Sequence, residues 1–424
     1  MNVAGDAGSE PLLVQVRELL RQGAVQAAAA VVDAALARAP ANADALYLRG
    51  VIANRRRDHG AAVGALRAAI AVRPDMALAW LALGNAYSRM GQVDAAVESY
   101  REVIAREPGW ADAHFNLGLM FKQQDERLAA ARALHAAWRC DPMLFDAATQ
   151  CVATLADCAR RGDTCAEPVL TGDKLPQRAV TIVLCSIDDA KHDRAVALYR
   201  RLFAAVAHDI VSIRDARSLA QAYNAAIARS ASDVVLLSHD DVDVLTPDFA
   251  ARLSARLREF DAVGVVGSTR MDGPAVGWSG HPYLRGWITH HAPTEAAWHV
   301  DVLDPHGAAG DLALLDGVLL AARREVFAAV PFDAATFDGF HLYDLDWSYR
   351  AARAGFRLGV AGELLVVHAS RGAYDARWQR DAERFCTKHD AGRTPARPSS
   401  FFGASLDSAD QVRTFYALLR ALSR

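Results

Sequence analysis

The sequence is poor in cysteine. Its six cysteines include no Cys-x-x-Cys pair, a spacing common in structural zinc sites, and they are few for a chain of 424 residues. Secreted domains that depend on disulfides carry a much higher density of cysteine. A structural zinc site and a disulfide framework are therefore both disfavoured.

Long apolar runs are missing as well. No stretch approaches the roughly 18 consecutive apolar residues that cross a bilayer. Residues 1–10 also lack the basic segment and apolar core of a secretory signal. We therefore expect a cytoplasmic protein without a transmembrane segment.

An excess of charge of one sign is lacking too, with 47 basic against 50 acidic side chains. Because nucleic-acid binding needs a basic surface, we expect no nucleic-acid partner. The length is too great for one ordinary hydrophobic core, which predicts two domains.

The first third of the chain contains a repeat of 34 residues. The period is marked by prolines at positions 40, 74, 108 and 142 and by glycines at positions 50, 84 and 118. Glycine lets the two helices of a hairpin approach closely, and proline ends the second helix. The pattern resembles the tetratricopeptide repeat. It predicts an all-α solenoid over residues 1–160, with about four repeats and a closing helix over 143–160.

Arrays of this kind form a concave groove. We expect the groove to hold a protein acceptor or a partner protein; a segment of the same chain or a homodimer is the alternative. Asn54, Asn85 and Asn116 recur at intervals of 31 rather than 34 residues. They are therefore not at equivalent repeat positions, and they receive no assigned role.

Residues 161–178 are polar and rich in helix breakers, which predicts a linker. From residue 179 onward, strands at 180–185, 210–213 and 233–237 alternate with helices at 194–207 and 218–229. This alternation predicts a doubly wound, mainly parallel α/β sheet. Apolar runs predict further strands at 262–267 and 313–320. The segment 186–189 after the first strand is no glycine-rich phosphate loop, so NAD and ATP are disfavoured, and a nucleotidyltransferase with them.

The strand at 233–237 runs into Ser238-His239-Asp240-Asp241. In open parallel sheets, ligands bind beyond the carboxyl ends of the strands, and carboxylates crowded there need a cation. We therefore expect a divalent metal at this point. The alternative is a solvated turn that caps the helix after Thr246-Pro247-Asp248.

Five motifs follow one another along this part of the chain: Ala222-Tyr223-Asn224, His239-Asp240-Asp241, Leu315-Asp316-Gly317, Tyr343-Asp344-Leu345-Asp346 and Val367-His368. Their order resembles that of family-2-type glycosyltransferases of the GT-A fold. The resemblance covers roughly residues 179–390. It implies a GT-A domain over residues 179–424 that takes a nucleotide-sugar donor.

The resemblance also implies a metal site for Mn²⁺ or Mg²⁺. The triplet His239-Asp240-Asp241 takes the place of the family's Asp-x-Asp motif, so Asp241 is the implied metal ligand, with Asp243 as a competing one. His368 completes the metal shell in this comparison. His239 stands where the family has an aspartate.

Inverting transfer needs one general base. In the family, the base is the aspartate of a Glu-Asp pair at the start of a helix. Here the pair reads Tyr343-Asp344, which implies Asp344 as the base, with Asp346 as the alternative. Stabilisation of the helix dipole is the competing explanation for both carboxylates, and Arg350 is the helix partner expected for Asp346.

The remaining site residues come from the same resemblance. The nucleotide-sugar donor is expected to contact Ser186, Asn224, His239, Asp240, Asp316 and Gly317. Residues 270–310 show little periodicity, and we expect them to form an acceptor-binding loop with Trp278, Trp287 and Trp298 as sugar-stacking platforms.

Together these features predict a metal-dependent, inverting glycosyltransferase that acts on a protein or a cell-surface glycan. Its repeats are expected to recruit the acceptor or a partner. The alternative is a non-catalytic repeat scaffold with a degenerate nucleotide-sugar-binding domain, because one aspartate and one glutamate of the family pattern are replaced.

Overall fold

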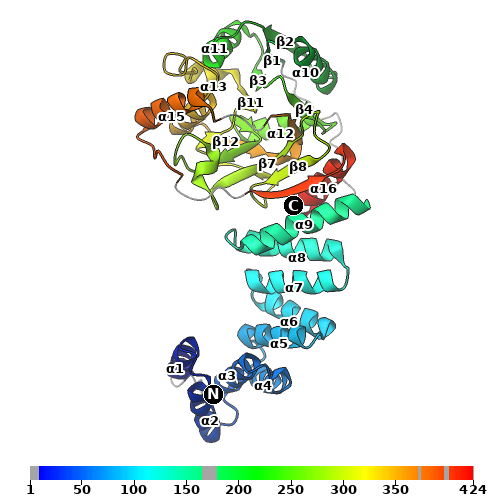
Figure 1. The fold of residues 1–424 in the computed structure, drawn as a ribbon, viewed down its shortest axis with the longest axis vertical. Coiled ribbons are helices and arrows are strands. Elements are labelled where there is room, and N and C mark those ends of the chain that lie inside the picture. The colour runs from blue at the N-terminus through cyan, green and yellow to red at the C-terminus, as the bar shows by residue number, and fades with distance from the viewer. Residues whose placement is uncertain (1–8, 165–178, 371–373, 396–400, 424) are drawn as a thin grey trace. The chain divides into compact units, whose positions relative to one another are not determined.

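The computed structural model describes residues 9–164, 179–370, 374–395 and 401–423 (Figure 1). Contacts divide the chain into two compact units, residues 1–151 and 152–424. Most of the linker expected at 161–178 lies outside the described residues. Among the described residues, no helix combines the length and the apolar character needed to cross a membrane.

The first unit is built from helical hairpins that follow one another along the chain (Figure 1, blue to cyan). The helices are α1 (Ser9–Arg21), α2 (Val25–Arg38), α3 (Ala43–Arg55), α4 (His59–Val72), α5 (Ala77–Arg89), α6 (Val93–Arg106), α7 (Ala111–Gln123) and α8 (Arg127–Cys140). Helix α9 (Phe145–Arg161) follows, and the division between the units falls inside it. The predicted helical repeat array is confirmed.

The periodic glycines lie where the two helices of a hairpin touch. A Cβ on Gly84 would lie 2.6 Å from a ring carbon of Tyr100. Gly50 and Gly118 stand in the same relation to leucines of their own hairpins. Any side chain at these positions would separate the helices, which explains the 34-residue spacing of glycine.

The asparagines without an assigned role connect consecutive hairpins. Asn116 donates from Nδ2 to Asn85 Oδ1 at 3.3 Å, and Asn54 donates to the carbonyl oxygen of Ala82 at 3.2 Å. Buried polar groups need such partners. These asparagines therefore serve the stacking of the repeats.

The second unit contains two sheets. The first has the strand order β2-β1-β3-β11-β5-β12-β9. Its strands are β1 (Val180–Cys185), β2 (His208–Ile213), β3 (Val234–Ser238), β5 (Ala262–Gly264), β9 (Ala308–Ala309), β11 (Leu319–Arg323) and β12 (Leu358–Ala361).

The α/β class is confirmed, and the sheet itself is mixed rather than mainly parallel. Strand β1 pairs in parallel with β2 and β3, but β11 lies antiparallel between β3 and β5. A parallel neighbour needs a crossover connection, usually a helix. The chain instead reaches β11 directly from β10 (Leu314–Leu315) through the turn at Asp316-Gly317, so the predicted single strand over 313–320 is two strands.

The second sheet has the order β10-β6-β7-β13-β4, and β8 joins it through β7. Its strands are β4 (Val242–Val244), β6 (Val266–Ser268), β7 (Leu284–His290), β8 (Trp298–Val302), β13 (Val366–His368) and β14 (Phe402–Leu406), which pairs with β8. Residues 270–310 are therefore not a loop. Strand β7 is buried on both faces, which removes the alternation that identifies a strand.

Two crossovers position the ligand-binding edge. Helix α10 (Asp189–Leu202) connects β1 to β2, and α11 (Leu219–Arg229) connects β2 to β3. Because β2 and β3 lie on opposite sides of β1, right-handed connections place α10 and α11 on opposite faces of the sheet. The carboxyl ends of β1 and β3 consequently form a topological switch point, where α/β sheets bind ligands.

Helix α10 begins five residues earlier than the predicted start at 194. The side chain of Asp188 accepts a hydrogen bond from the backbone N–H of Lys191 and caps the helix there. The other helices are α12 (Phe249–Glu259), α13 (Arg324–Ala329), α14 (Tyr343–Arg353), α15 (Ala376–His389) and α16 (Ala409–Ser423), with short 3-10 turns η2 (Val276–Ser279) and η3 (Gly362–Leu364).

Candidate active site

A pocket of about 770 Å³ opens at the switch point. Residues 185–187 after β1 and residues 239–241 after β3 line it, together with Asp316 and the first residues of α14. The pocket thus collects most of the sequence-predicted site residues, which come from segments far apart in the chain.

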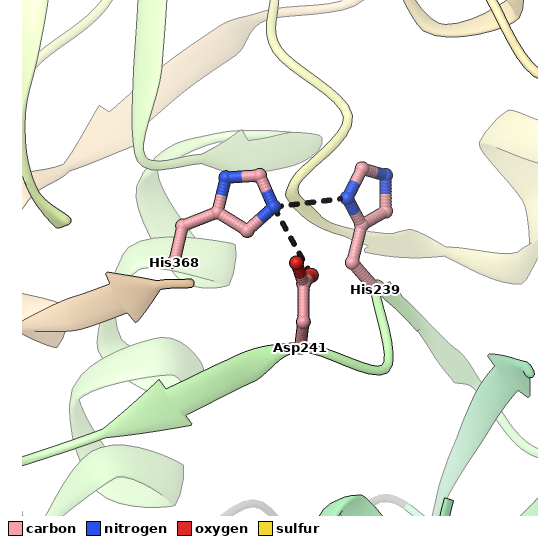
Figure 2. A group of neighbouring side chains, drawn as sticks. All are labelled: His239, Asp241 and His368. Carbon is pink, nitrogen blue, oxygen red and sulfur yellow. Dashed lines mark hydrogen bonds and ion pairs between the residues drawn. The ribbon is translucent and has the colours of Figure 1, made fainter. Parts of the chain in front are cut away.

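Three side chains in this pocket converge on one point (Figure 2). His368 Nε2 lies 3.1 Å from Asp241 Oδ1 and 3.4 Å from His239 Nδ1. One ligand atom from each residue falls within 4.8 Å of the other two. Two imidazoles and a carboxylate form a set of donors suited to a divalent transition-metal ion.

The surroundings of His239 disfavour a proton on its imidazole. Burial lowers the pKa of His239, and His368 lowers it further. Burial alone would raise the pKa of Asp241, but the hydrogen bond and charge of His368, together with His239, bring it well below its usual range. Tyr343 Oη lies 3.4 Å from His239 Nε2, so it can accept that N–H and leave Nδ1 facing the other two side chains.

Asp344 lies at the start of α14, and Gly317 fixes its carboxylate. The Gly317 N–H donates to Asp344 Oδ2 at 2.7 Å. A Cβ on Gly317 would lie 2.7 Å from Asp344 Cβ and 2.8 Å from its Oδ2. Burial, and then the charge of Asp316, raise the pKa of Asp344 to about 7. The carboxylate is therefore poised to exchange a proton near neutral pH.

Ser186 and Asp240 connect the ends of β1 and β3. The Ser186 hydroxyl donates to Asp240 Oδ2 at 2.5 Å, and both residues line the pocket. This hydrogen bond turns one carboxylate oxygen of Asp240 toward β1. The sequence-predicted placement of both residues beside a ligand fits this geometry.

Asn224 does not reach the pocket. Its side chain donates to the carbonyl oxygen of Phe332 at 2.8 Å and accepts from the N–H of the same residue at 3.0 Å. The residue therefore holds the segment before α14 against α11. Leu219 and Tyr223 are the residues of α11 that line the pocket.

Asp243 also lies outside the pocket. It is exposed on β4 between the buried Val242 and Val244, and its Oδ1 accepts from the N–H of Val244. The chain turns at Asp240-Asp241 before β4 begins, so Asp241 and Asp243 face different surroundings. The competing assignment of Asp243 as a metal ligand is not supported by its position.

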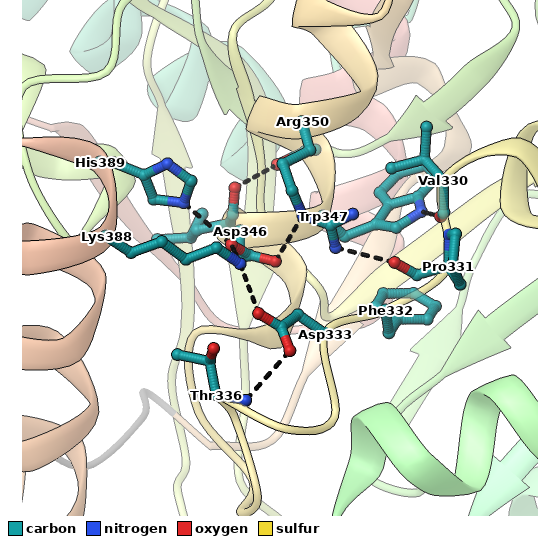
Figure 3. Close-up of polar contacts among 12 residues, drawn as sticks. Val330, Pro331, Phe332, Asp333, Thr336, Asp346, Trp347, Arg350, Lys388 and His389 are labelled. Atoms are coloured by element: carbon teal, nitrogen blue, oxygen red, sulfur yellow. Dashed lines mark hydrogen bonds and ion pairs between the residues drawn. The ribbon is translucent and has the colours of Figure 1, made fainter.

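Asp346 is fully buried, and basic side chains of α14 and α15 surround its carboxylate (Figure 3). Its carboxylate contacts Lys388 Nζ at 2.5 Å, Arg350 Nε at 2.8 Å and His389 Nε2 at 2.9 Å. Residues two apart on a helix differ by about 200° in direction, so Asp344 and Asp346 cannot both face the pocket. Asp346 is a structural anchor rather than an alternative base.

The three tryptophans expected to stack on sugars have different environments. Trp278 lines the pocket. Trp287 is fully buried, with its N–H bonded to the carbonyl oxygen of Asp304, and belongs to the core. Trp298 stacks on His291 at 3.9 Å and lies outside the pocket.

Sequence reasoning missed part of the lining. Tyr374 and Trp378, at the start of α15, face the pocket beside Trp278, and Tyr223 and Tyr343 form part of its wall. The only local signal was Asp375, which caps α15 by accepting from the N–H groups of Arg377 and Trp378. A cap predicts where a helix begins but not which pocket the helix reaches.

The charge of the lining is one-sided. In the described part of the chain, the lining contains five aspartates and four histidines but no lysine or arginine. The aspartates are Asp240, Asp241, Asp301, Asp316 and Asp344. An anion that enters this pocket would meet these carboxylates, and a bound cation would offset their repulsion.

Comparison with protein-family models assigns both units. Residues 181–389 match a glycosyltransferase-like family. Residues 13–77 and 55–88 match one tetratricopeptide-repeat model, and residues 84–125 match another. No curated protein matches the chain.

Several solved structures are similar to the repeat region. A crystal structure of MamA is 20% identical, covers 34% of this chain and 83% of its own, and superposes with a TM-score of 0.32. TTC0263, a thermophilic TPR protein of Thermus thermophilus, is 18% identical. Its match covers 35% of this chain and 82% of its own, with a TM-score of 0.31. PilF of Pseudomonas aeruginosa is also 18% identical. Its match covers 35% of this chain and 68% of its own, with a TM-score of 0.34.

Proposed function

Because this chain joins tetratricopeptide repeats to a glycosyltransferase-like domain, we propose that it transfers a sugar from a nucleotide-sugar donor to an acceptor hydroxyl, with inversion and with a divalent metal. The observation that carries the proposal is the pocket at the switch point. It brings the group His239, Asp241 and His368 together with Asp344.

The residues present fit a metal ion. His239, Asp241 and His368 offer two nitrogens and one oxygen within 4.8 Å of one another. Magnesium prefers oxygen ligands, so the two imidazoles favour Mn²⁺ over Mg²⁺. When bound, the ion would neutralise the pyrophosphate of the donor and of the departing nucleoside diphosphate.

The one-sided charge of the lining supports metal dependence. A nucleotide sugar carries a doubly charged pyrophosphate, and no described lysine or arginine of the lining is present to balance it. Carboxylates at Asp240, Asp316 and Asp344 would repel the donor. A bound cation at the His239, Asp241 and His368 group removes this obstacle.

Asp344 is the proposed general base. It takes the proton of the acceptor hydroxyl while that oxygen forms a bond to the anomeric carbon of the donor. The bond between the anomeric carbon and the phosphate oxygen breaks on the opposite side, so a single displacement inverts the configuration. The N–H of Gly317 holds the carboxylate in place, and the raised pKa suits proton acceptance near neutrality.

The end of the pocket between β1 and β3 is the proposed nucleoside site. Ser186 and Asp240 are linked there by a hydrogen bond, and Asp240 retains acceptor capacity for a ribose or base. Leu219 and Tyr223 supply the apolar wall. The tetratricopeptide repeats are proposed to bind a protein, either the acceptor itself or a partner.

The test is donor binding and donor hydrolysis across a panel of nucleotide sugars, with Mn²⁺, with Mg²⁺ and with a chelator. We expect at least one donor to bind and turn over only with metal. Asp241→Ala should lose this activity, whereas Asp243→Ala, an exposed aspartate two residues away, should keep it. Metal-independent turnover would contradict the metal assignment, and donor binding without any turnover would indicate the non-catalytic scaffold.

A further inference from the structure

The pocket lining contains a cluster of aromatic rings in contact with one another. We name it the aromatic corner, and its members are Trp278, Tyr374 and Trp378; Phe340 and Phe401 line the same pocket. Large apolar side chains that are exposed in the described part of the second unit are Ile187, Phe340, Tyr374 and Phe401, and all four line this one pocket. Exposed apolar groups gathered in one concave place mark a surface for a ligand.

The rings of the corner meet at steep angles. Trp278 and Trp378 have centroids 6.4 Å apart and planes 59° apart, and Tyr374 packs edge-on against Trp378 at 4.8 Å and 79°. These rings therefore pack edge to face on one another rather than in a parallel stack.

Backbone contacts hold the two tryptophans in place. A Cβ on Gly273 would overlap Cε3 of Trp278, so this indole occupies the space that any other residue would fill. Asp375 accepts from the N–H of Trp378 at 2.9 Å and fixes the start of α15. The corner is therefore organised before any ligand arrives.

The corner continues into the segment that carries the proposed base. Phe340 and His341 lead directly into Tyr343 and Asp344, all of which line the pocket. His341 Nε2 lies 3.9 Å from Asp375 Oδ1, which brings this segment beside α15. A ring held in the corner thus lies in the same pocket as the carboxylate that would take its proton.

We propose that the aromatic corner binds the acceptor and that the acceptor is a neutral pyranose of a glycan; this inference rests on the proposed function. The C–H face of a pyranose packs on aromatic rings, and its hydroxyls donate to carboxylates and imidazoles such as Asp301 and His290. The five aspartates of the described lining disfavour an anionic sugar. One ring hydroxyl gives its proton to Asp344 as its oxygen joins the anomeric carbon, and the nucleoside diphosphate leaves.

The experiment uses the full chain with Mn²⁺ and the donors that it hydrolyses. Methyl glycosides of glucose, galactose, mannose and N-acetylglucosamine are the probes, and methyl glucuronide is the anionic contrast. At least one neutral glycoside should raise nucleotide release above the rate of donor hydrolysis, and the glucuronide should not. Saturation-transfer NMR should show binding of the same neutral glycoside independently of turnover.

Variants locate the binding. Trp378→Ala and Tyr374→Ala should each raise the KM for the glycoside about tenfold while the KM for the donor stays within about twofold. Trp378→Phe should raise the KM for the glycoside less than Trp378→Ala does. Trp298→Phe is the matched control, because this indole stacks on His291 outside the pocket. Tyr374 is 66% exposed, so its replacement leaves the core intact.

The outcomes separate the two proposals. Donor turnover without binding or transfer to any neutral glycoside would overturn the acceptor assignment and leave the proposed function standing. An increase in the donor KM in Trp378→Ala, with the glycoside KM unchanged, would overturn it too, because the corner would then hold the nucleobase instead. Absence of donor binding and of glycoside binding in the parent chain would overturn both.

Discussion

At the scale of single residues, His239 is the informative position in the site. The resemblance led us to expect an aspartate there, yet the imidazole takes part in the same convergent group as Asp241 and His368. In the proposed metal site, a nitrogen ligand in place of an oxygen ligand would change the preferred ion rather than abolish binding.

His239→Asp should therefore shift the metal preference. A second carboxylate suits the harder Mg²⁺, so we expect the ratio of activity with Mn²⁺ to activity with Mg²⁺ to fall on the order of tenfold. Titration of donor hydrolysis with each metal measures the ratio. Asp243→Ala should leave it unchanged, and an unaltered ratio in His239→Asp would show that this residue is no ligand.

Asp344→Asn should keep donor affinity and lose turnover. Removal of a general base typically costs about 10² to 10⁴ in rate, and the loss should appear in kcat. Calorimetry with the donor and steady-state kinetics separate the two effects. Because of that expected range, a variant with more than about a tenth of the parent kcat would exclude Asp344 as the base.

The pH profile should report the same carboxylate. The active form is deprotonated, so kcat/KM should fall as the pH drops below about 7, the value to which burial and Asp316 raise the pKa of Asp344. Asp316→Asn removes the like charge and should move this acidic limb to lower pH. An acidic limb at the same or a higher pH in Asp316→Asn would contradict the effect of Asp316 on the pKa of Asp344.

Motif reasoning placed most of the predicted site residues in the pocket. Those that line it are Ser186, His239, Asp240, Asp241, Asp316, Asp344 and His368, and Gly317 holds Asp344 from behind. Asn224, Asp243 and Asp346 lie elsewhere, because a motif specifies positions in the chain but not the direction of each side chain. The turn before β4 and the roughly 100° step of a helix decide which carboxylate reaches the pocket.

At the scale of elements, helix α14 carries two aspartates with different surroundings, the proposed base Asp344 and the buried, ion-paired Asp346. Asp344 faces a pocket whose described lining holds no lysine or arginine, whereas Asp346 joins α14 to α15 through Lys388 and His389 (Figure 3). Further along the same network, burial alone would raise the pKa of Asp333, but its hydrogen bonds with Lys388 and Thr336 lower it.

Asp346→Ala should destabilise the second unit by about 3 kcal/mol, because three buried or half-buried partners lose their common carboxylate. Urea unfolding of the full chain measures the change. The pKa of Asp346 is lowered despite burial, through His389, Lys388 and Arg350, so its contribution is present at neutral pH and is lost as the pH falls through the lowered value. Asp344→Asn is the matched control, and an equal loss in both variants would refute the division of roles.

The strand predicted over residues 262–267 is wrong. The run over 262–267 looks like one strand, but its two halves, β5 and β6, belong to different sheets. Both halves are buried, so no alternation marks the change. By contrast, β1 was predicted to the residue, because an apolar run of strand length stands between polar segments.

At the scale of the whole molecule, the chain consists of two compact units. The repeat period alone predicted the helical hairpins of the first unit, since each hairpin depends on a few local contacts. The second unit depends on pairing between segments far apart in the chain, such as β3 with β11. Only the order of its motifs, and not the sheet order, could be predicted from the sequence.

Two glycines of the repeat unit provide a matched test. Gly84→Ala places a methyl group 2.6 Å from Tyr100 and should cost about 1–3 kcal/mol. A Cβ on Gly64 would meet no atom within 4 Å, so Gly64→Ala should gain about 0.5–1 kcal/mol. Hydrogen exchange of α5 and α6 measures the first effect, and donor hydrolysis by the second unit should not change. Equal protection in both variants would contradict the role of the periodic glycine.

The shortage of positive side chains in the described lining has a thermodynamic consequence. If the donor enters only with a cation, the two ligands bind with positive heterotropic cooperativity, and each raises the affinity for the other by the same factor. A donor dissociation constant then has meaning only at a stated metal concentration. Manganese supply, as much as sugar-nucleotide supply, would set the range over which the domain works.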